Sequence, residues 1–119
     1  MTIAQALEKL ERSPFRRRFH LSAADRAYIR DKGLDTVERH GADFIRQRLA
    51  PAHIPNDGRQ TPMKGHPIFV AQHATACCCR GCLEKWYGIP AGTELTEAVQ
   101  AGILALLMAW IRRQLTQEI

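Results

Sequence analysis

The chain has 119 residues, of which 45% are hydrophobic and 24% are charged. This length suits a single domain with its own core, and the composition excludes wholesale disorder. The 17 basic and 12 acidic residues give a net charge of +5, which permits an acidic partner such as nucleic acid without requiring one.

The excess charge lies in residues 12–48, which hold ten basic and five acidic residues. Nine of the ten basic residues are arginines, whose planar guanidinium suits contacts with phosphate or carboxylate. Within this segment, Arg16, Arg17 and Arg18 stand between two phenylalanines, a pattern typical of nucleic-acid-binding residues. The competing interpretation is a solvated basic face that the two phenylalanines anchor to the core.

The sequence shows no sign of a membrane segment or a signal peptide. The first residues lack a basic region followed by an apolar run, and the most apolar stretch, residues 101–111, is shorter than the roughly 20 residues of a bilayer span. We therefore expect a cytoplasmic protein that contacts no membrane. In a reducing compartment, its four cysteines favour metal binding or thiol chemistry over a structural disulfide.

In chain order, apolar residues at helical spacing first predict an N-terminal helix in residues 1–12. Residues 13–49 form an arginine-rich helical segment with two predicted helices. The first begins at the capping residue Ser22 and ends at Gly33, the usual C-terminal glycine. The second begins with Asp35 as its cap and runs to about residue 49.

Residues 50–92 are predicted to contain a long loop and a site of histidines and cysteines, because prolines and an Asn-Asp-Gly turn interrupt regular structure. A short helix over residues 83–87, closed by Gly88, lies within this region. The last segment, residues 93–117, is predicted to be a core helix capped by Thr93.

Apolar residues surround most of this last helix, which is therefore either the central helix of the core or half of a homodimer interface. No segment alternates between apolar and polar residues as a strand would. We predict a mostly α protein, a small single-domain helical fold with a long loop, a turn rich in cysteine and histidine, and a long apolar C-terminal helix in the core.

The strongest chemical signal is the run CCCRGC at residues 77–82. Cys79 and Cys82 have the spacing that lets two thiolates bind one ion from a tight turn, and Gly81 permits the unusual backbone of such a turn. A tetrahedral site needs two more ligands, and thiolate or imidazole suits zinc. The candidates for these two ligands are Cys78, His73 and His66.

Helical geometry limits how these candidates combine. In an unbroken helix, His66, His73 and Cys77 would share one face, and Cys79 and Cys82 would point to the opposite side. A site shared by histidine and cysteine therefore requires the chain to turn around residues 76–81. The alternative roles are structural, with His66 capping the turn before Pro67 and His73 hydrogen-bonding to backbone in the core.

Zinc is the metal that this pattern favours, ahead of an iron–sulfur cluster. Because a single Cys-x-x-Cys pair supplies half of a zinc site, inert or redox-active thiols are an open alternative. A thioredoxin-like dithiol is disfavoured because the sequence lacks the strand–helix alternation of that fold.

Three functions are consistent with these residues. The first is a small metal-binding protein that contacts nucleic acid through its arginine-rich segment. The second is a metal-dependent hydrolase or nuclease, with His66 or Glu84 as a base, although no His-Glu-x-x-His or deaminase pattern occurs. The third is a structural or partner-binding protein that forms a homodimer through the C-terminal helix and has inert thiols. The sequence assigns no catalytic residue.

The same residues resemble those of a bacterial family of unknown function, numbered 4186 among such domains. The resemblance runs from about Arg12 to Leu115 and is carried by DGRQTP at 57–62, GHPIFVAQHATA at 65–76, CCRGCLEKW at 78–86 and MAWI at 108–111. It implies a single-domain cytosolic bacterial protein whose defining feature is a core of histidine and cysteine. Cys77 stands where the family pattern has threonine, which implies that it is the cysteine least suited to be a ligand. Tyr87 stands where a histidine often follows the tryptophan.

Overall fold

A computed structural model describes residues 1–117, which form seven helices and no strand. The predicted mostly helical fold is therefore confirmed. The helices are α1 (Ile3–Glu11), α2 (Pro14–Arg17), α3 (Ala23–Lys32), α4 (Leu34–Arg48), α5 (Pro67–Ala74), α6 (Arg80–Tyr87) and α7 (Glu97–Thr116).

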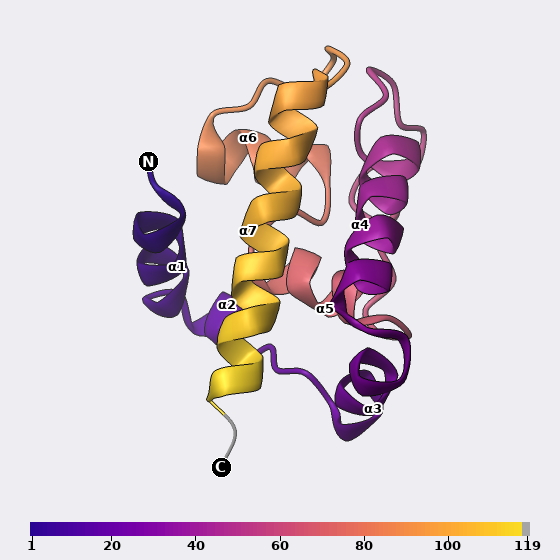
Figure 1. The fold of residues 1–119 in the computed structure, drawn as a ribbon. Coiled ribbons are helices and arrows are strands. Elements are labelled where there is room, and N and C mark those ends of the chain that lie inside the picture. The colour runs from indigo at the N-terminus through magenta and orange to yellow at the C-terminus, as the bar shows by residue number, and fades with distance from the viewer. Residues whose placement is uncertain (118–119) are drawn as a thin grey trace.

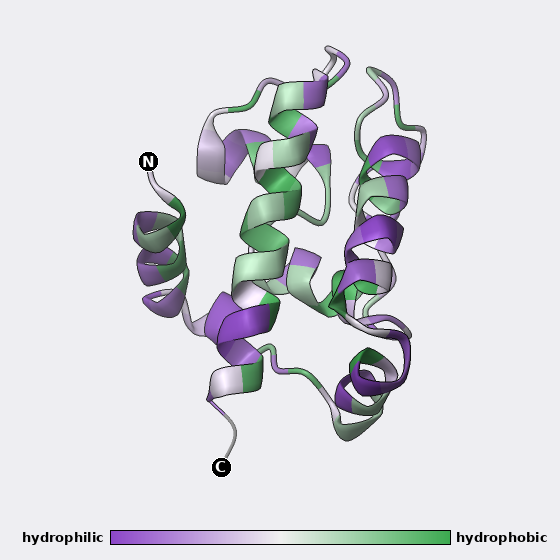
Figure 2. Cartoon of the chain, in the orientation of Figure 1, coloured by the Kyte–Doolittle hydropathy of each residue, from purple (hydrophilic) through white to green (hydrophobic). Residues whose placement is uncertain are grey.

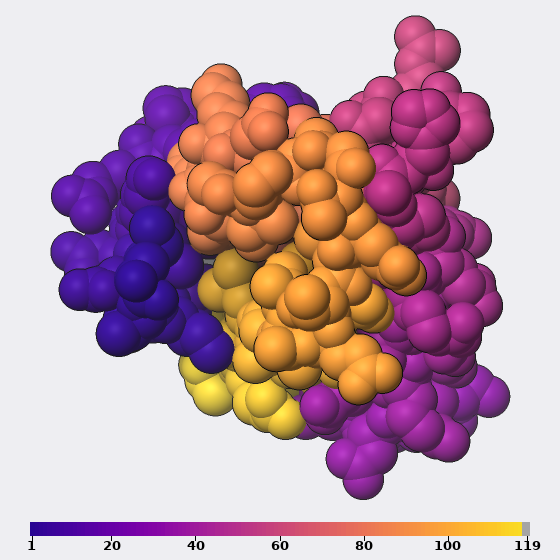
Figure 3. Space-filling model, turned by 90° about the horizontal axis from the view of Figure 1, so that it is seen from above, coloured from indigo at the N-terminus to yellow at the C-terminus, as the bar shows by residue number. Residues whose placement is uncertain are grey.

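Helix α7 forms the centre of the molecule (Figure 1). It packs against α4 and α5 on one side and α1 on the other. Seen from above, the N-terminal segment and the segment around α4 lie on opposite sides of the chain that carries α6 and the start of α7 (Figure 3). This arrangement favours the core interpretation of the last helix over that of an exposed dimer helix.

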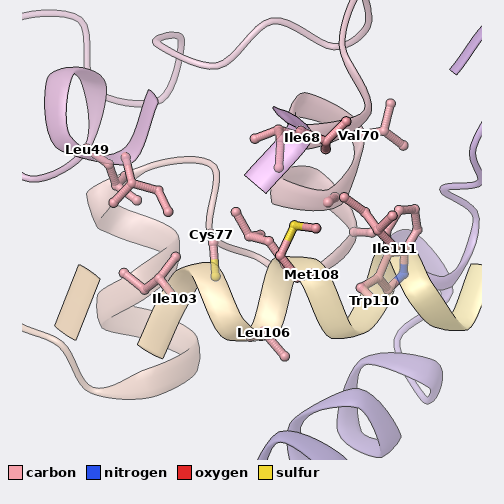
Figure 4. Packing of buried hydrophobic residues seen from close by; sticks show 14 of the residues in the cluster. Leu49, Ile68, Val70, Cys77, Ile103, Leu106, Met108, Trp110 and Ile111 are labelled. Carbon is pink, nitrogen blue, oxygen red and sulfur yellow. The ribbon is translucent and has the colours of Figure 1, made fainter. Parts of the chain in front are cut away.

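The core gathers along the buried side of α7. Leu107 and Ile111 are fully buried, as are Ile45 of α4 and Ile68 of α5. The close view shows Met108 and Ile111 facing Ile68 (Figure 4). Hydrophobic residues predominate along the upper part of α7, whereas strongly hydrophilic residues appear in its last turns (Figure 2). Within residues 1–117, no helix is long and apolar enough to cross a membrane.

The start of α7 differs from the prediction. The helix begins at Glu97 with Thr96 as its cap, so the predicted cap Thr93 lies outside it. Tertiary contacts explain the difference: the backbone N–H of Leu95 donates to the carbonyl of Ala50 at 2.9 Å, which holds the chain extended before the helix.

The N-terminal predictions are mostly confirmed. Helix α1 ends at Glu11, and Ser22 caps α3 in a reciprocal capping box with Asp25. Helix α4 instead begins directly after Gly33, which ends α3 with φ 88° and leaves α4 without a side-chain cap. The predicted cap Asp35 therefore lies inside the first turn of α4, where its negative charge still favours the helix N-terminus.

Two short helices lie inside residues 50–92, the region predicted to hold the long loop. Helix α5 begins at Pro67 after the capping residue His66. Helix α6 extends the predicted short helix by three residues, because it begins at Arg80 rather than residue 83, and it ends at Gly88 as predicted. Residues 50–66 lack regular structure, which confirms the long loop expected in the first part of this region.

Candidate metal centre

Three thiols meet at the turn that leads into α6. The sulfur atoms of Cys78, Cys79 and Cys82 all lie within 4.8 Å of one another. Cys79 is the N-cap of α6, and its Sγ accepts the backbone N–H of Cys82 at 3.3 Å. The sulfurs of Cys78 and Cys82 are 3.7 Å apart. The two cysteines of the predicted pair and one of the added candidates therefore form one cluster.

The chain turns at Ala76, not at Gly81. Ala76 has φ 60°, a left-handed conformation that a residue with a side chain rarely adopts, and it separates α5 from the cysteine turn. Gly81 is an ordinary helical residue, so the prediction that it provides an unusual backbone conformation was wrong. A Cβ at Gly81 would lie 3.7 Å from Asp57 Oδ2 and 3.9 Å from Cys79 Sγ, which are ordinary contacts.

Side chains of the loop before α5 hold the cysteine turn in place through hydrogen bonds. Asp57 Oδ1 accepts the backbone N–H of Arg80 at 2.9 Å, and its Oδ2 accepts that of Gly81 at 3.3 Å. These bonds satisfy free N–H groups at the start of α6. Thr61 Oγ1 donates to the carbonyl oxygen of Cys78 at 2.8 Å. Burial alone would raise the pKa of Asp57, but hydrogen bonds from Gln60 and from the helix start lower it.

Arg16 is the residue that sequence reasoning misplaced. It was predicted at a nucleic-acid surface, but its side chain is buried and only 9% of the residue is exposed. Its guanidinium donates to Cys82 Sγ at 3.3 Å, to Cys78 Sγ at 3.8 Å and to the carbonyl of His73 at 2.8 Å. The Ser13-Pro14 pair was the available signal, because it caps and starts the short helix α2 that directs Arg16 inward. Arg17 and Arg18 remain exposed.

The three clustered thiols differ in acidity. Hydrogen bonds from Cys78 first, and then from Cys79 and Arg16, lower the pKa of Cys82 to about 5. The hydrogen bond that Cys78 donates to Cys82, together with burial, raises the pKa of Cys78. Burial also raises the pKa of Cys79. The cluster therefore already favours one thiolate at neutral pH, and a bound cation would favour the others.

Cys77 lies apart from this cluster. It is fully buried, and its sulfur lies against α7 near Ile103 (Figure 4). Its thiol donates to the carbonyl of Thr75 at 3.6 Å, and burial raises its pKa to about 12. These are properties of a core residue, which agrees with the prediction that Cys77 is the cysteine least suited to be a ligand.

The two candidate histidines have other partners. His73 Nε2 lies 3.2 Å from the carbonyl oxygen of Thr61 and 3.1 Å from that of Pro62, and its ring stacks on Phe19. His66 caps α5, because its Nδ1 accepts the backbone N–H of Ile68 at 3.0 Å. The structural roles suggested for both histidines are thus present, and neither belongs to the thiol cluster in the described part of the chain.

Comparison with known proteins places this arrangement in a family. A family described as Domain of unknown function (DUF4186) matches residues 4–112, nearly the whole chain. The chain belongs to this family. The match begins earlier and ends slightly earlier than the resemblance that the sequence suggested, and it includes Arg16 and the three clustered cysteines. No solved structure matches the chain significantly.

Proposed function

We propose that this DUF4186 protein binds a zinc ion through the thiolates of Cys78, Cys79 and Cys82. The mutual approach of the three sulfurs within 4.8 Å is the observation that carries the proposal. A tetrahedral zinc ion with zinc–sulfur bonds of about 2.3 Å separates its sulfur ligands by about 3.8 Å. The 3.7 Å between Cys78 and Cys82 Sγ is already close to that separation.

The donor set supports zinc over an iron–sulfur cluster. Such clusters are usually held by four cysteines, and the fourth cysteine of this chain, Cys77, is in the core beside α7. Charge balance also supports a zinc site. Three thiolates and Zn²⁺ carry a net charge of −1, and the buried guanidinium of Arg16, which contacts two of the sulfurs, supplies the opposite charge.

Three protein ligands leave one tetrahedral position for water, a substrate or a partner's side chain. This is the ligand number of many catalytic zinc sites, and it keeps hydrolysis as an alternative role. The two bases suggested for that role are engaged elsewhere: His66 caps α5, and Glu84 Oε2 accepts the backbone N–H of Ala91 at 3.2 Å. We therefore propose metal binding and assign no reaction.

The test is the metal content of protein purified without added metal, measured by mass spectrometry of the elements. We expect one zinc per chain, and its loss in each of Cys78→Ser, Cys79→Ser and Cys82→Ser. Cys77→Ala is the matched control and should keep its zinc. Circular dichroism shows whether each variant is folded. A folded wild-type protein without metal, or full zinc in Cys82→Ser, would contradict the proposal.

Nucleic-acid binding is the second candidate, and one surface feature favours it. A cavity of about 540 Å³ lies between the segment after α2, the start of α3 and the residues before α5. Arg18 and Lys64 are exposed in its wall, and Phe19 and Tyr28 also line it. Cations beside aromatic faces suit the phosphates and bases of a single strand.

Fluorescence anisotropy with a labelled single-stranded oligonucleotide tests this second candidate across a salt series. We expect Arg18→Ala and Lys64→Ala to weaken binding and to reduce its salt dependence, as the loss of a phosphate contact does. The control is Arg112→Ala, an exposed arginine of α7 outside the cavity. Equal effects of all three substitutions would argue for unspecific attraction to a basic protein.

A further inference from the structure

The clustered thiols also have the geometry of a pair that an oxidant can join. Cys78 and Cys82 Sγ lie 3.7 Å apart, so modest side-chain rotation brings them to the length of a disulfide bond, about 2.05 Å. The two thiols differ in access. Cys82 is partly exposed, whereas Cys78 is buried, with only 8% of the residue exposed. An oxidant from solvent therefore meets Cys82 first, with Cys78 beside it.

We propose that Cys78 and Cys82 are a hydroperoxide-sensitive pair whose oxidation releases both the metal and the α2 segment. The release of metal rests on the zinc site proposed above, whereas the disulfide and the movement of α2 do not. Hydrogen peroxide is the simplest oxidant of this class.

The chemistry balances in two steps. The Cys82 thiolate attacks one peroxide oxygen, the O–O bond breaks, and after proton uptake the products are Cys82 sulfenic acid and one water molecule. The Cys78 thiol then attacks the sulfenic sulfur, which forms the disulfide and releases a second water molecule. Each of the two sulfurs loses one electron, and these two electrons reduce the peroxide to two water molecules. No further reductant is required for this single turnover.

The disulfide has a direct effect on Arg16. In the reduced protein, the buried guanidinium donates to both sulfurs of the pair. Disulfide sulfurs are poor acceptors, so oxidation weakens both of these hydrogen bonds to the guanidinium. The guanidinium also donates to the carbonyl of His73, which is a neutral partner. A buried charge in this situation favours exposure to water.

Helix α2 is poorly placed to resist this change. It is only four residues long, and Arg16 is its buried residue. Phe15 on the same helix is already 48% exposed. When Arg16 leaves the thiols, the exposed Arg17 and Arg18 move with it. The oxidation state of the cysteines would thereby control the arginine-rich segment, which connects the two chemical features that the sequence keeps apart.

The experiment treats the purified protein with about one equivalent of hydrogen peroxide. Peptide mapping identifies the disulfide, a chromogenic chelator measures released zinc, and limited trypsin digestion reports α2 through cleavage after Arg16, Arg17 and Arg18. We expect a Cys78–Cys82 disulfide, zinc release in proportion to it, and cleavage at α2 that is about tenfold faster. A dithiol reductant should restore the slow cleavage.

Two variants make the result specific. Cys77→Ala keeps the pair and should respond as the wild type does, whereas Cys78→Ser lacks the second thiol and should show no faster cleavage after peroxide. A disulfide that maps to Cys79 and Cys82, or unchanged cleavage despite a Cys78–Cys82 disulfide, would overturn the proposal. Purified protein without zinc would contradict the metal site alone, since the disulfide and the cleavage are still measured.

Discussion

Replacing His66 by asparagine should remove a large part of the acid sensitivity of the fold. His66 is buried, with 8% of the residue exposed. Its Nδ1 accepts the backbone N–H of Ile68, so the neutral ring carries its proton on Nε2, which lies 3.0 Å from His40 Nδ1. Protonation of Nδ1 would place two N–H groups against each other and destroy the cap of α5.

The magnitude follows from the pKa of His66. Burial first, and then the proximity of His40, lower this pKa from 6.5 to about 4. The folded protein thus binds fewer protons than the unfolded chain, so the contribution of His66 is complete above about pH 6.5 and is lost as the pH falls toward 4. Linkage makes the full contribution about 3 kcal/mol, of which about 2 kcal/mol disappears between about pH 7 and about pH 4.5.

The assay is urea unfolding at a series of pH values, followed by circular dichroism in matched buffers. In His66→Asn, the asparagine keeps a side-chain cap for α5 but does not titrate. We expect the free energy of unfolding of the variant to fall by about 2 kcal/mol less than that of the wild type across this range. His20→Asn, at an exposed histidine, controls for the loss of any one imidazole. Identical pH profiles for wild type and His66→Asn would refute the reasoning.

Three further predictions concern the packing that positions the thiol cluster. A Cβ at Gly41 would lie 2.8 Å from Ile68 Cδ1 and 2.9 Å from Leu104 Cδ1, whereas one at Gly102 meets nothing within 4 Å. In chemical denaturation, Gly41→Ala should therefore be about 1–3 kcal/mol less stable than Gly102→Ala. Equal stabilities would show that the side chains of Ile68 and Leu104 can move to accommodate a methyl group at position 41. Thr96→Ala should lower the free energy of unfolding by about 1 kcal/mol because it removes the cap of α7. Thr93→Ala should change it by less than about 0.5 kcal/mol. The reverse order would show that Thr93, the cap predicted from the sequence, caps the helix. Arg80→Lys should cost about 3 kcal/mol or more, because one ammonium does not reach the carbonyls of both loops that the guanidinium joins, and a thermal midpoint equal to that of the wild type would exclude this bridging role.

Local signals in the sequence were sufficient for most helix ends. The capping box at Ser22 and the glycines at positions 33 and 88 act through bonds within a few residues, and each ends or begins a helix as predicted. Thr93 failed as a cap because a distant residue decides the outcome. The hydrogen bond from Leu95 N–H to the carbonyl of Ala50 joins segments 45 positions apart in the chain, and no local pattern reports it.

Local signals also identified part of the candidate site, whereas the residues that depend on distant contacts were placed wrongly or left open. The Cys-x-x-Cys spacing identified Cys79 and Cys82, and proximity in sequence added Cys78. The inclusion of His73 and His66 depended on the path of the chain after α5, which the left-handed turn at Ala76 sets. Arg16 was assigned to the surface because its basic neighbours dominate the local composition. Its burial depends on contacts with residues 57 to 66 positions away.

A comparison of the two buried arginines, Arg16 and Arg80, shows why a negative charge on the thiol cluster is favourable. The guanidinium of Arg80 donates to backbone carbonyls of residues 49, 51, 90 and 93, and this set of dipoles disperses its charge. Arg16 has one such carbonyl, from His73, and two sulfurs. Neutral thiols are weak acceptors, so a thiolate among the two sulfurs makes the burial of Arg16 more favourable. The same negative charge is what the zinc ion proposed above would bind, so the position of α2 and the proposed affinity for metal depend on one common property of the cluster.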